Sequence, residues 1–119
     1  NKKNRTQLIM PASNLSEVIK KNYKPLGNRI IDYGLKILDN NKILIKNSNC
    51  VLPRPLVIGY ALAFCLSTKP KEVFLIGFDG YKKDDPFNDD TQMILNFYNN
   101  SKYNKKIKLL SSSGYKFIN

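Results

Sequence analysis

The chain has 119 residues, of which 42% are hydrophobic and 11% aromatic, and 20 basic against nine acidic residues give a formal net charge of +11. This length fits a single domain, residues 1–119, and the apolar content excludes an intrinsically disordered chain. The sequence contains no histidine, the commonest metal ligand and the commonest general base at neutral pH. Zinc sites and Ser-His-Asp catalysis within these residues are therefore excluded.

The sequence predicts neither a membrane span nor a disulfide. The longest uncharged stretch, residues 55–68, is shorter than the roughly 20 residues that cross a bilayer. Cys50 and Cys65 lack the CxxC spacing of a redox or metal site, so we expect no metal and a cytoplasmic location. The first residue is Asn1 and no signal-peptide pattern follows it, so we expect a piece of a longer polypeptide.

The positive charge comes almost entirely from lysine, because only Arg5, Arg29 and Arg54 are arginine. The lysines are scattered along the chain among many asparagines, and no nucleic-acid recognition motif accompanies them. We therefore expect no specific binding of nucleic acid, and a mild preference for small anionic molecules.

The first half of the chain predicts a strand, a helix and two further strands. Residues 7–10 form a short apolar run that ends at Pro11, and Ser13-Asn14 can cap a helix over residues 15–21. Two runs with β-branched residues flank the turn-forming Asp39-Asn40-Asn41 and are compatible with an antiparallel hairpin: residues 29–33 and 42–45.

The second half predicts a helix, a strand, a second helix and a last strand. Residues 56–66 are apolar all around, as in a helix packed closely on a sheet, and residues 73–78 read as a central parallel strand covered on both faces. Pro86 then begins a helix that reaches about Tyr98, and residues 107–110 form a further strand, with another indicated at residues 115–118. The expected fold is a small Rossmann-like, three-layer α/β domain with a mostly parallel sheet.

The loop after the central strand is the first candidate site. In parallel sheets the carboxyl ends of the strands line the ligand crevice, and this edge would hold Asp79, Gly80 and Tyr81. Gly80 permits a sharp turn, Asp79 offers an acceptor for a hydroxyl or a cation, and Tyr81 combines an apolar ring with a hydroxyl. Asp79 can equally brace its own loop by accepting hydrogen bonds from nearby amides.

Two helix starts are further candidates. Arg54 precedes the apolar helix, where an arginine and free backbone amides can receive a phosphate or carboxylate, and Ser13 lies at the corresponding place after the first strand. The acidic residues of segment 84–90 are explained by the dipole of the helix that they precede, and their spacing is not that of a calcium loop. No GxGxxG fingerprint is present, so we expect no cofactor.

Three segments together resemble a known domain: Gly59-Tyr60-Ala61-Leu62-Ala63, Val73-Phe74-Leu75-Ile76-Gly77-Phe78-Asp79-Gly80-Tyr81 and Asp84-Asp85-Pro86. The pattern is similar to the C-terminal domain that follows an HMG-CoA-lyase-like barrel, of the 4-hydroxy-2-oxovalerate aldolase type, in bacterial surface-polysaccharide clusters. It also resembles nucleotide-sugar α/β domains of sialyltransferase-like proteins. Either resemblance implies a role in sugar-polymer biosynthesis, with Asp79 and Tyr81 at the matched loop and no catalytic residue carried over.

Three functions stay open at this point. The preferred one is an accessory or substrate-binding domain of an aldolase-like polysaccharide enzyme, whose ligand is a sugar, nucleotide sugar or related anionic metabolite and whose partner is the parent domain. The second is a fragment of a sialyltransferase-like glycosyltransferase. The third is a structural or homo-oligomerisation module without a ligand. The residues leave open whether the domain is itself catalytic.

Overall fold

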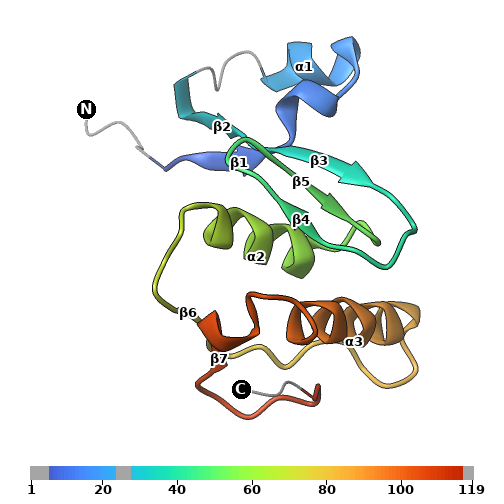
Figure 1. Ribbon diagram of the computed structural model, residues 1–119. Coiled ribbons are helices and arrows are strands. Elements are labelled where there is room, and N and C mark those ends of the chain that lie inside the picture. Colours follow the sequence, from blue (N-terminus) through green and yellow to red (C-terminus); the bar gives the residue numbers. More distant parts are fainter. Residues whose placement is uncertain (1–5, 24–27, 117–119) are drawn as a thin grey trace.

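The computed structural model describes residues 6–23 and 28–116 of the chain. Figure 1 shows the helix α2 between an upper layer of strands and a lower layer that holds α3 with the strands β6 and β7. The elements in chain order are β1 (Leu8–Met10), η1 (Ala12–Asn14), α1 (Glu17–Tyr23), β2 (Ile30–Asp32), β3 (Gly34–Ile37), β4 (Leu44–Ile45), β5 (Asn49–Leu52), α2 (Val57–Ser67), β6 (Val73–Leu75), α3 (Pro86–Asn99), η3 (Asn104–Lys106) and β7 (Ile107–Leu109).

The Rossmann-like prediction is wrong, because the strands form three short sheets instead of one parallel sheet. β1 pairs with β2 and β6 pairs with β7, both in parallel, while the third sheet is mixed, with β5 parallel to β3 and antiparallel to β4. The strands are only two to four residues long. The α/β class is correct, and the single continuous sheet is not.

Tyr33 and Gly34 link the first two sheets. The Tyr33 amide donates to the Met10 carbonyl, at 3.1 Å, and the next amide, of Gly34, donates to the Ser48 carbonyl, at 2.9 Å. Successive amides of an extended chain point to opposite edges. The segment from β2 into β3 therefore pairs with β1 along one edge and with β5 along the other.

The helix α2 is buried from two sides, as its uniform apolarity predicts. Ala63 packs in a cluster with Tyr33, Cys50 and Leu52, which belong to the upper strands. Leu62 and Leu66 pack in a second cluster with residues of α3 and β7. Because Gly59 has no side chain, α2 approaches Ile94 and Leu52 closely, and the buried Tyr98 hydroxyl donates to the Gly59 carbonyl at 2.7 Å.

The prediction that residues 73–78 form a buried central strand is also wrong. β6 ends at Leu75 and pairs only with β7, and the side chains of Phe74 and Ile76 are 47% and 72% exposed. Gly77 adopts φ +65° and turns the chain out of the extended conformation. A continuous apolar run does not by itself distinguish a strand covered on both faces from an edge strand.

Two local predictions in the first half need correction. Ser13 and Asn14 do not cap α1; they form η1, and the hydroxyl of Ser16 instead accepts from the Ile19 amide, at 3.5 Å. The predicted hairpin is absent, since β2 pairs with β1 and β4 pairs with β5. The hairpin partner of β4 is thus the following strand, which the sequence analysis did not predict.

The other predicted elements agree with the structure. The strands at residues 7–10 and 107–110, the apolar helix and the helix that begins at Pro86 are confirmed. Tyr115 and Lys116 are not in a strand, and the rest of the predicted strand at 115–118 lies outside the described residues. Within the described ranges, no helix combines the length and apolarity needed to cross a bilayer.

We predict that Ile94→Ala lowers the free energy of unfolding by about 2–5 kcal/mol, because Ile94 is fully buried where α3 meets α2. Urea unfolding measures the change. Val18→Ala on α1 is the control and should change stability by less than about 0.5 kcal/mol, since Val18 is 72% exposed. Equal losses in both variants would mean that the contact between α2 and α3 does not hold the fold together.

Candidate functional site

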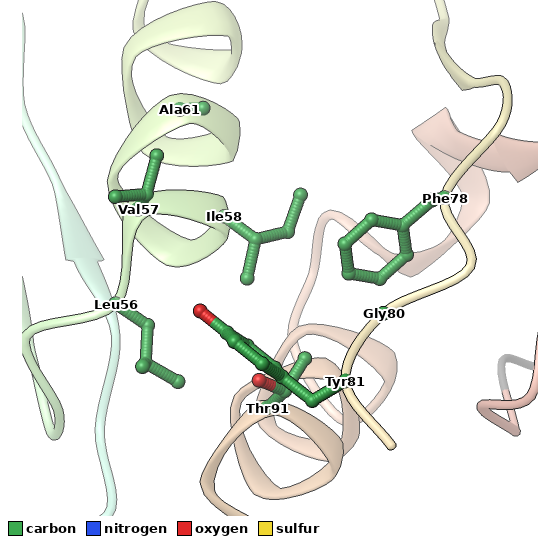
Figure 2. Close-up of a pocket in the computed structure, with 8 residues that line it drawn as sticks. All are labelled: Leu56, Val57, Ile58, Ala61, Phe78, Gly80, Tyr81 and Thr91. Carbon is green, nitrogen blue, oxygen red and sulfur yellow. The ribbon is translucent and has the colours of Figure 1, made fainter. Parts of the chain in front are cut away.

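A cavity of about 340 Å³ lies beyond the carboxyl end of β6, between the starts of α2 and α3. We call it the Tyr81 cavity. In Figure 2 the Tyr81 ring lies across its floor with the hydroxyl directed toward α2, and the Phe78 ring faces Ile58. Its lining residues are Leu56, Val57, Ile58, Ala61, Phe78, Gly80, Tyr81 and Thr91.

Tyr115 positions the loop that forms one wall of this cavity. Its hydroxyl accepts a hydrogen bond from the Tyr81 amide, at 2.8 Å, and its ring stacks on Phe78 with centroids 5.4 Å apart. Gly80 has φ +78°, and a Cβ at this position would overlap the Tyr115 ring. Gly80 is therefore required both for the backbone conformation and for the close packing of Tyr115.

The Tyr81 side chain is supported from the other direction by α3. Its ring packs against Phe87 with centroids 5.6 Å apart. Asp85 caps α3 by accepting from the Phe87 amide at 2.9 Å, and Pro86 occupies the first turn. The Thr91 hydroxyl donates to the Phe87 carbonyl at 2.6 Å, and Thr91 is fully buried behind the cavity wall.

The start of α2, at the opposite wall, is not capped by a side chain. Its cap residue is Leu56, and its first turn contains no acidic residue, in contrast to α3 with Asp85 and Asp89. The first amides of a helix lack intrahelical acceptors and carry its positive dipole end. Because Leu56, Val57 and Ile58 line the Tyr81 cavity, this end of α2 borders it.

The structure distributes the predicted site residues over several places. Gly80 and Tyr81 line the Tyr81 cavity, whereas Asp79 is exposed and outside its lining. Arg54 bridges two carboxylates: Nη1 lies 3.0 Å from Asp39 Oδ1, and Nε lies 3.8 Å from Asp90 Oδ1. The guanidinium thus ties the start of α3 to the turn before β4.

Ser13 lies in a different, more polar cavity of about 580 Å³ near β3 and β5. Its amide and hydroxyl both lie within hydrogen-bonding distance of Asp32 Oδ1, at 3.2 and 3.4 Å. Asn14 accepts from the Leu35 amide at 3.1 Å. These two polar residues therefore connect η1 to the strands β2 and β3, and the structure does not bring Ser13 together with Tyr81.

The sequence analysis did not identify Tyr115 as part of the site. Tyr115 is 34 residues beyond Tyr81, and it was assigned to a strand. The acidic residues near α3 have local partners, with Asp85 on the Phe87 amide and Asp90 near Arg54. Over residues 6–23 and 28–116, no group of three or more His, Cys, Asp or Glu side chains is placed to hold a metal ion.

The titratable groups with clearly shifted pKa values lie in the core. Burial raises the pKa of Cys50 to about 11 and the pKa of Tyr33 and Tyr60 to about 12, in each case chiefly through desolvation of the charged form. Burial raises the pKa of Tyr98 as well. None of these four groups is among the described residues that line the Tyr81 cavity. The shifts favour neutral, unreactive side chains.

Comparisons with protein-family models, curated proteins and solved structures found no match to this chain. The resemblance to aldolase-associated and sialyltransferase-like domains therefore stays an expectation.

We predict that Gly80→Ala destabilises the domain more than Gly77→Ala does. Both residues have positive φ, so an added Cβ costs roughly 1–2 kcal/mol at either position, but Gly77 has open space around it and Gly80 faces Tyr115. The overlap at Gly80 should add about 1–3 kcal/mol in a denaturant melt. The idea that Tyr115 holds this loop fails if the two variants lose the same stability.

The two cysteines should differ in reactivity. Cys50 is buried with a pKa of about 11 and Cys65 is exposed, and a thiol reagent attacks the accessible thiolate. At pH 8 the native protein should release one equivalent of thionitrobenzoate from Ellman's reagent, and the urea-unfolded protein two. The rapid equivalent should be lost in Cys65→Ala. A rapid equivalent that is still released by Cys65→Ala would show that Cys50 is accessible.

The raised pKa of Cys50 also predicts alkaline destabilisation. The unfolded thiol ionises near its ordinary pKa of 9.0 while the folded thiol stays neutral until about pH 11, so stability is complete below pH 9 and falls as the pH rises toward 11. Cys50→Ala should flatten this fall most clearly near pH 9, where the unfolded tyrosines, with an ordinary pKa of 10.0, are still largely protonated, and Cys65→Ala serves as control. A slope unchanged by Cys50→Ala would contradict the assignment.

Proposed function

We propose that this domain is an accessory, substrate-binding module whose Tyr81 cavity takes a small anionic metabolite of the sugar or nucleotide-sugar class. The observation that carries the proposal is the position of Tyr81. Its ring and hydroxyl lie in a preformed cavity at the carboxyl end of a parallel strand, opposite the uncapped start of α2. Such strand ends commonly hold ligands in α/β proteins.

The walls of the cavity favour a ligand with a ring. Most lining side chains are aliphatic or aromatic, and Phe78 and Tyr81 offer ring faces against which a base or a sugar packs. The accessible polar side chain of the lining is Tyr81, since Thr91 is fully buried. A volume of about 340 Å³ lies within the range of roughly 300–1,000 Å³ usual for small-molecule sites.

The charge around the cavity favours an anionic group on that ligand. The amides at the start of α2 are not satisfied by a capping side chain, and such amides bind phosphate or carboxylate well. The chain as a whole carries a net charge of +11, which attracts anions from solution. Arg54, held between Asp39 and Asp90, contributes by fixing α3 beside α2.

The sequence resemblance supplies the wider setting of the proposal. The matched segments include Phe78, Gly80 and Tyr81, which all line the cavity. We place the module in the cytoplasm, as part of a larger enzyme of bacterial polysaccharide biosynthesis whose aldolase-like domain is its partner. The module then supplies recognition of the sugar, and the partner domain supplies the chemistry.

Titration calorimetry with UDP, UDP-glucose and glucose phosphate tests the proposal. We predict saturable binding of at least one of them, and about fivefold weaker binding to Tyr81→Phe, the loss expected for one hydrogen bond of about 1 kcal/mol. Ser48→Ala, which removes a hydroxyl from the turn before β5, away from both the Tyr81 cavity and the end of α2, should bind as the unmodified protein does. No binding at millimolar ligand would overturn the proposal.

A cavity-filling variant locates the site. Ala61 lines the Tyr81 cavity and is exposed, and Cys65 lies one helical turn further along α2, also exposed and outside the lining. Ala61→Leu should abolish binding and Cys65→Leu should preserve it. Binding that survives Ala61→Leu would place the ligand elsewhere.

The open face of β6 favours a second candidate function, that of a packing module. Phe74 on this strand and Ile76 just after it are exposed, and a neighbouring domain of the same polypeptide can cover them. Under this function the cavity binds no ligand, and Phe74→Ser with Ile76→Ser weakens docking of the parent domain without unfolding this one. Ligand titration and domain docking thus separate the two candidates.

A further inference from the structure

Four lysines from three separate stretches of the sequence meet at one cleft near the carboxyl end of α2. The cleft has a volume of about 230 Å³, and its lining includes Lys46, Lys69, Lys102 and Lys106. They come from the turn between β4 and β5, the end of α2, the segment after α3, and η3. We call this site the lysine cleft.

The charge of the lysine cleft is not balanced by nearby carboxylates. No Asp or Glu is among the described residues that line it, and no ion pair in the described part of the chain involves these four lysines. Like charges that share a small volume repel one another. Grouping them is unfavourable unless an anion lies between them.

The terminal carbonyls of α2 and α3 do not need these lysines as hydrogen-bond donors. At the end of α2 the Ser67 hydroxyl donates to the Phe64 carbonyl at 2.6 Å, and the Thr68 hydroxyl donates to the Cys65 carbonyl at 2.7 Å. At the end of α3 the Ser101 hydroxyl donates to the Tyr98 carbonyl at 2.6 Å. Hydroxyl groups therefore satisfy these terminal carbonyls without the lysines.

Lys69 occupies a backbone position that disfavours lysine. It follows the last turn of α2 with φ +57°, and its amide donates to the Leu66 carbonyl at 3.1 Å. Glycine or asparagine is the usual residue at such a helix end, because a Cβ strains the left-handed conformation. Lys69 thus joins the three other lysines of the lining from a backbone position that does not favour it.

The backbone under the other lysines is held in place. The Tyr33 hydroxyl donates to the Lys46 carbonyl at 2.9 Å, and the Lys106 amide donates to the Tyr103 carbonyl at 2.9 Å. The Lys102 ammonium lies 5.3 Å from the centre of the Tyr103 ring. The four chain segments are therefore already positioned, so that an anion has to order only the ends of the lysine side chains.

We propose that the lysine cleft is a second binding site, which takes a small multivalent phosphoanion of the diphosphate class. Four ammonium groups match the charge of a diphosphate. The volume is below the range usual for larger organic ligands. The site is distinct from the Tyr81 cavity, because the two lie at opposite ends of α2.

Titration with inorganic pyrophosphate tests this site. Pyrophosphate should bind the unmodified protein and raise its melting temperature. Sulfate should bind more weakly than pyrophosphate. Lys46→Gln with Lys106→Gln should weaken pyrophosphate binding at least tenfold. The matched control, Lys21→Gln with Lys36→Gln, removes the same charge from α1 and β3 and should leave binding unchanged. Equal weakening by both pairs would show diffuse attraction only and would overturn the proposal.

Lys69→Gly separates binding from structure. Glycine relieves the left-handed strain, so the melting temperature of the free protein should rise while the affinity for pyrophosphate falls. Unchanged affinity in this variant would overturn the role of Lys69 in the cleft. Two further probes complete the experiment. One is a vesicle that contains phosphatidic acid, and the other is a single-stranded oligonucleotide. If the vesicle or the oligonucleotide binds through these lysines and pyrophosphate does not, the proposal is overturned. The cleft is then a membrane-binding or nucleic-acid-binding surface.

Discussion

Burial of α2 from two sides is the constraint on which the rest of this structure depends. One side packs against the strands β3, β5 and β4, and the other packs against α3 with β6 and β7. An 11-residue helix that is apolar all around gains this stabilisation only when both layers are present. The contact at Gly59, with the Tyr98 hydroxyl on its carbonyl, fixes the distance between the layers.

The position of α2 also determines where ligands can bind. A central helix presents two ends of opposite polarity to the surface, and each end borders a hollow formed with the neighbouring layers. At the start, which has no side-chain cap, residues 56–58 line the same cavity as Tyr81. At the end, hydroxyl groups satisfy the carbonyls, and lysines from four segments gather around them. The two proposed sites therefore follow from one element of the fold.

The sequence predicts the local elements well and their arrangement poorly. The helices α2 and α3 were predictable because their signals are local. α2 is a continuous apolar run, and α3 begins at Pro86 and has apolar residues at helical spacing. The three separate sheets were not, because pairing depends on contacts between strands of two to four residues that carry weak individual signals. The continuous apolarity of residues 73–78 was misleading, since the strand ends at Leu75 and Phe74 is exposed on a two-stranded sheet.

The candidate site shows the same difference between local signals and contacts between distant residues. Gly80 and Tyr81 were predictable because a loop after an apolar strand is a local feature. Tyr115 and the lysine cleft were not, because they depend on residues that come together only in the folded chain. The lysines that look scattered in the sequence include four that converge, which no count of charges along the chain reveals.

The shape of β6 also affects how this protein resists aggregation. An unpaired strand edge with exposed Phe74 is a template on which other chains can add strands. Here the template is only three residues long, because Gly77 turns the backbone away, and the ion pair between Lys108 and Glu72 places charges on the pair of strands. A growing cross-β assembly needs segments of about six residues in register. The three residues of β6 are therefore shorter than the segment that such an assembly needs.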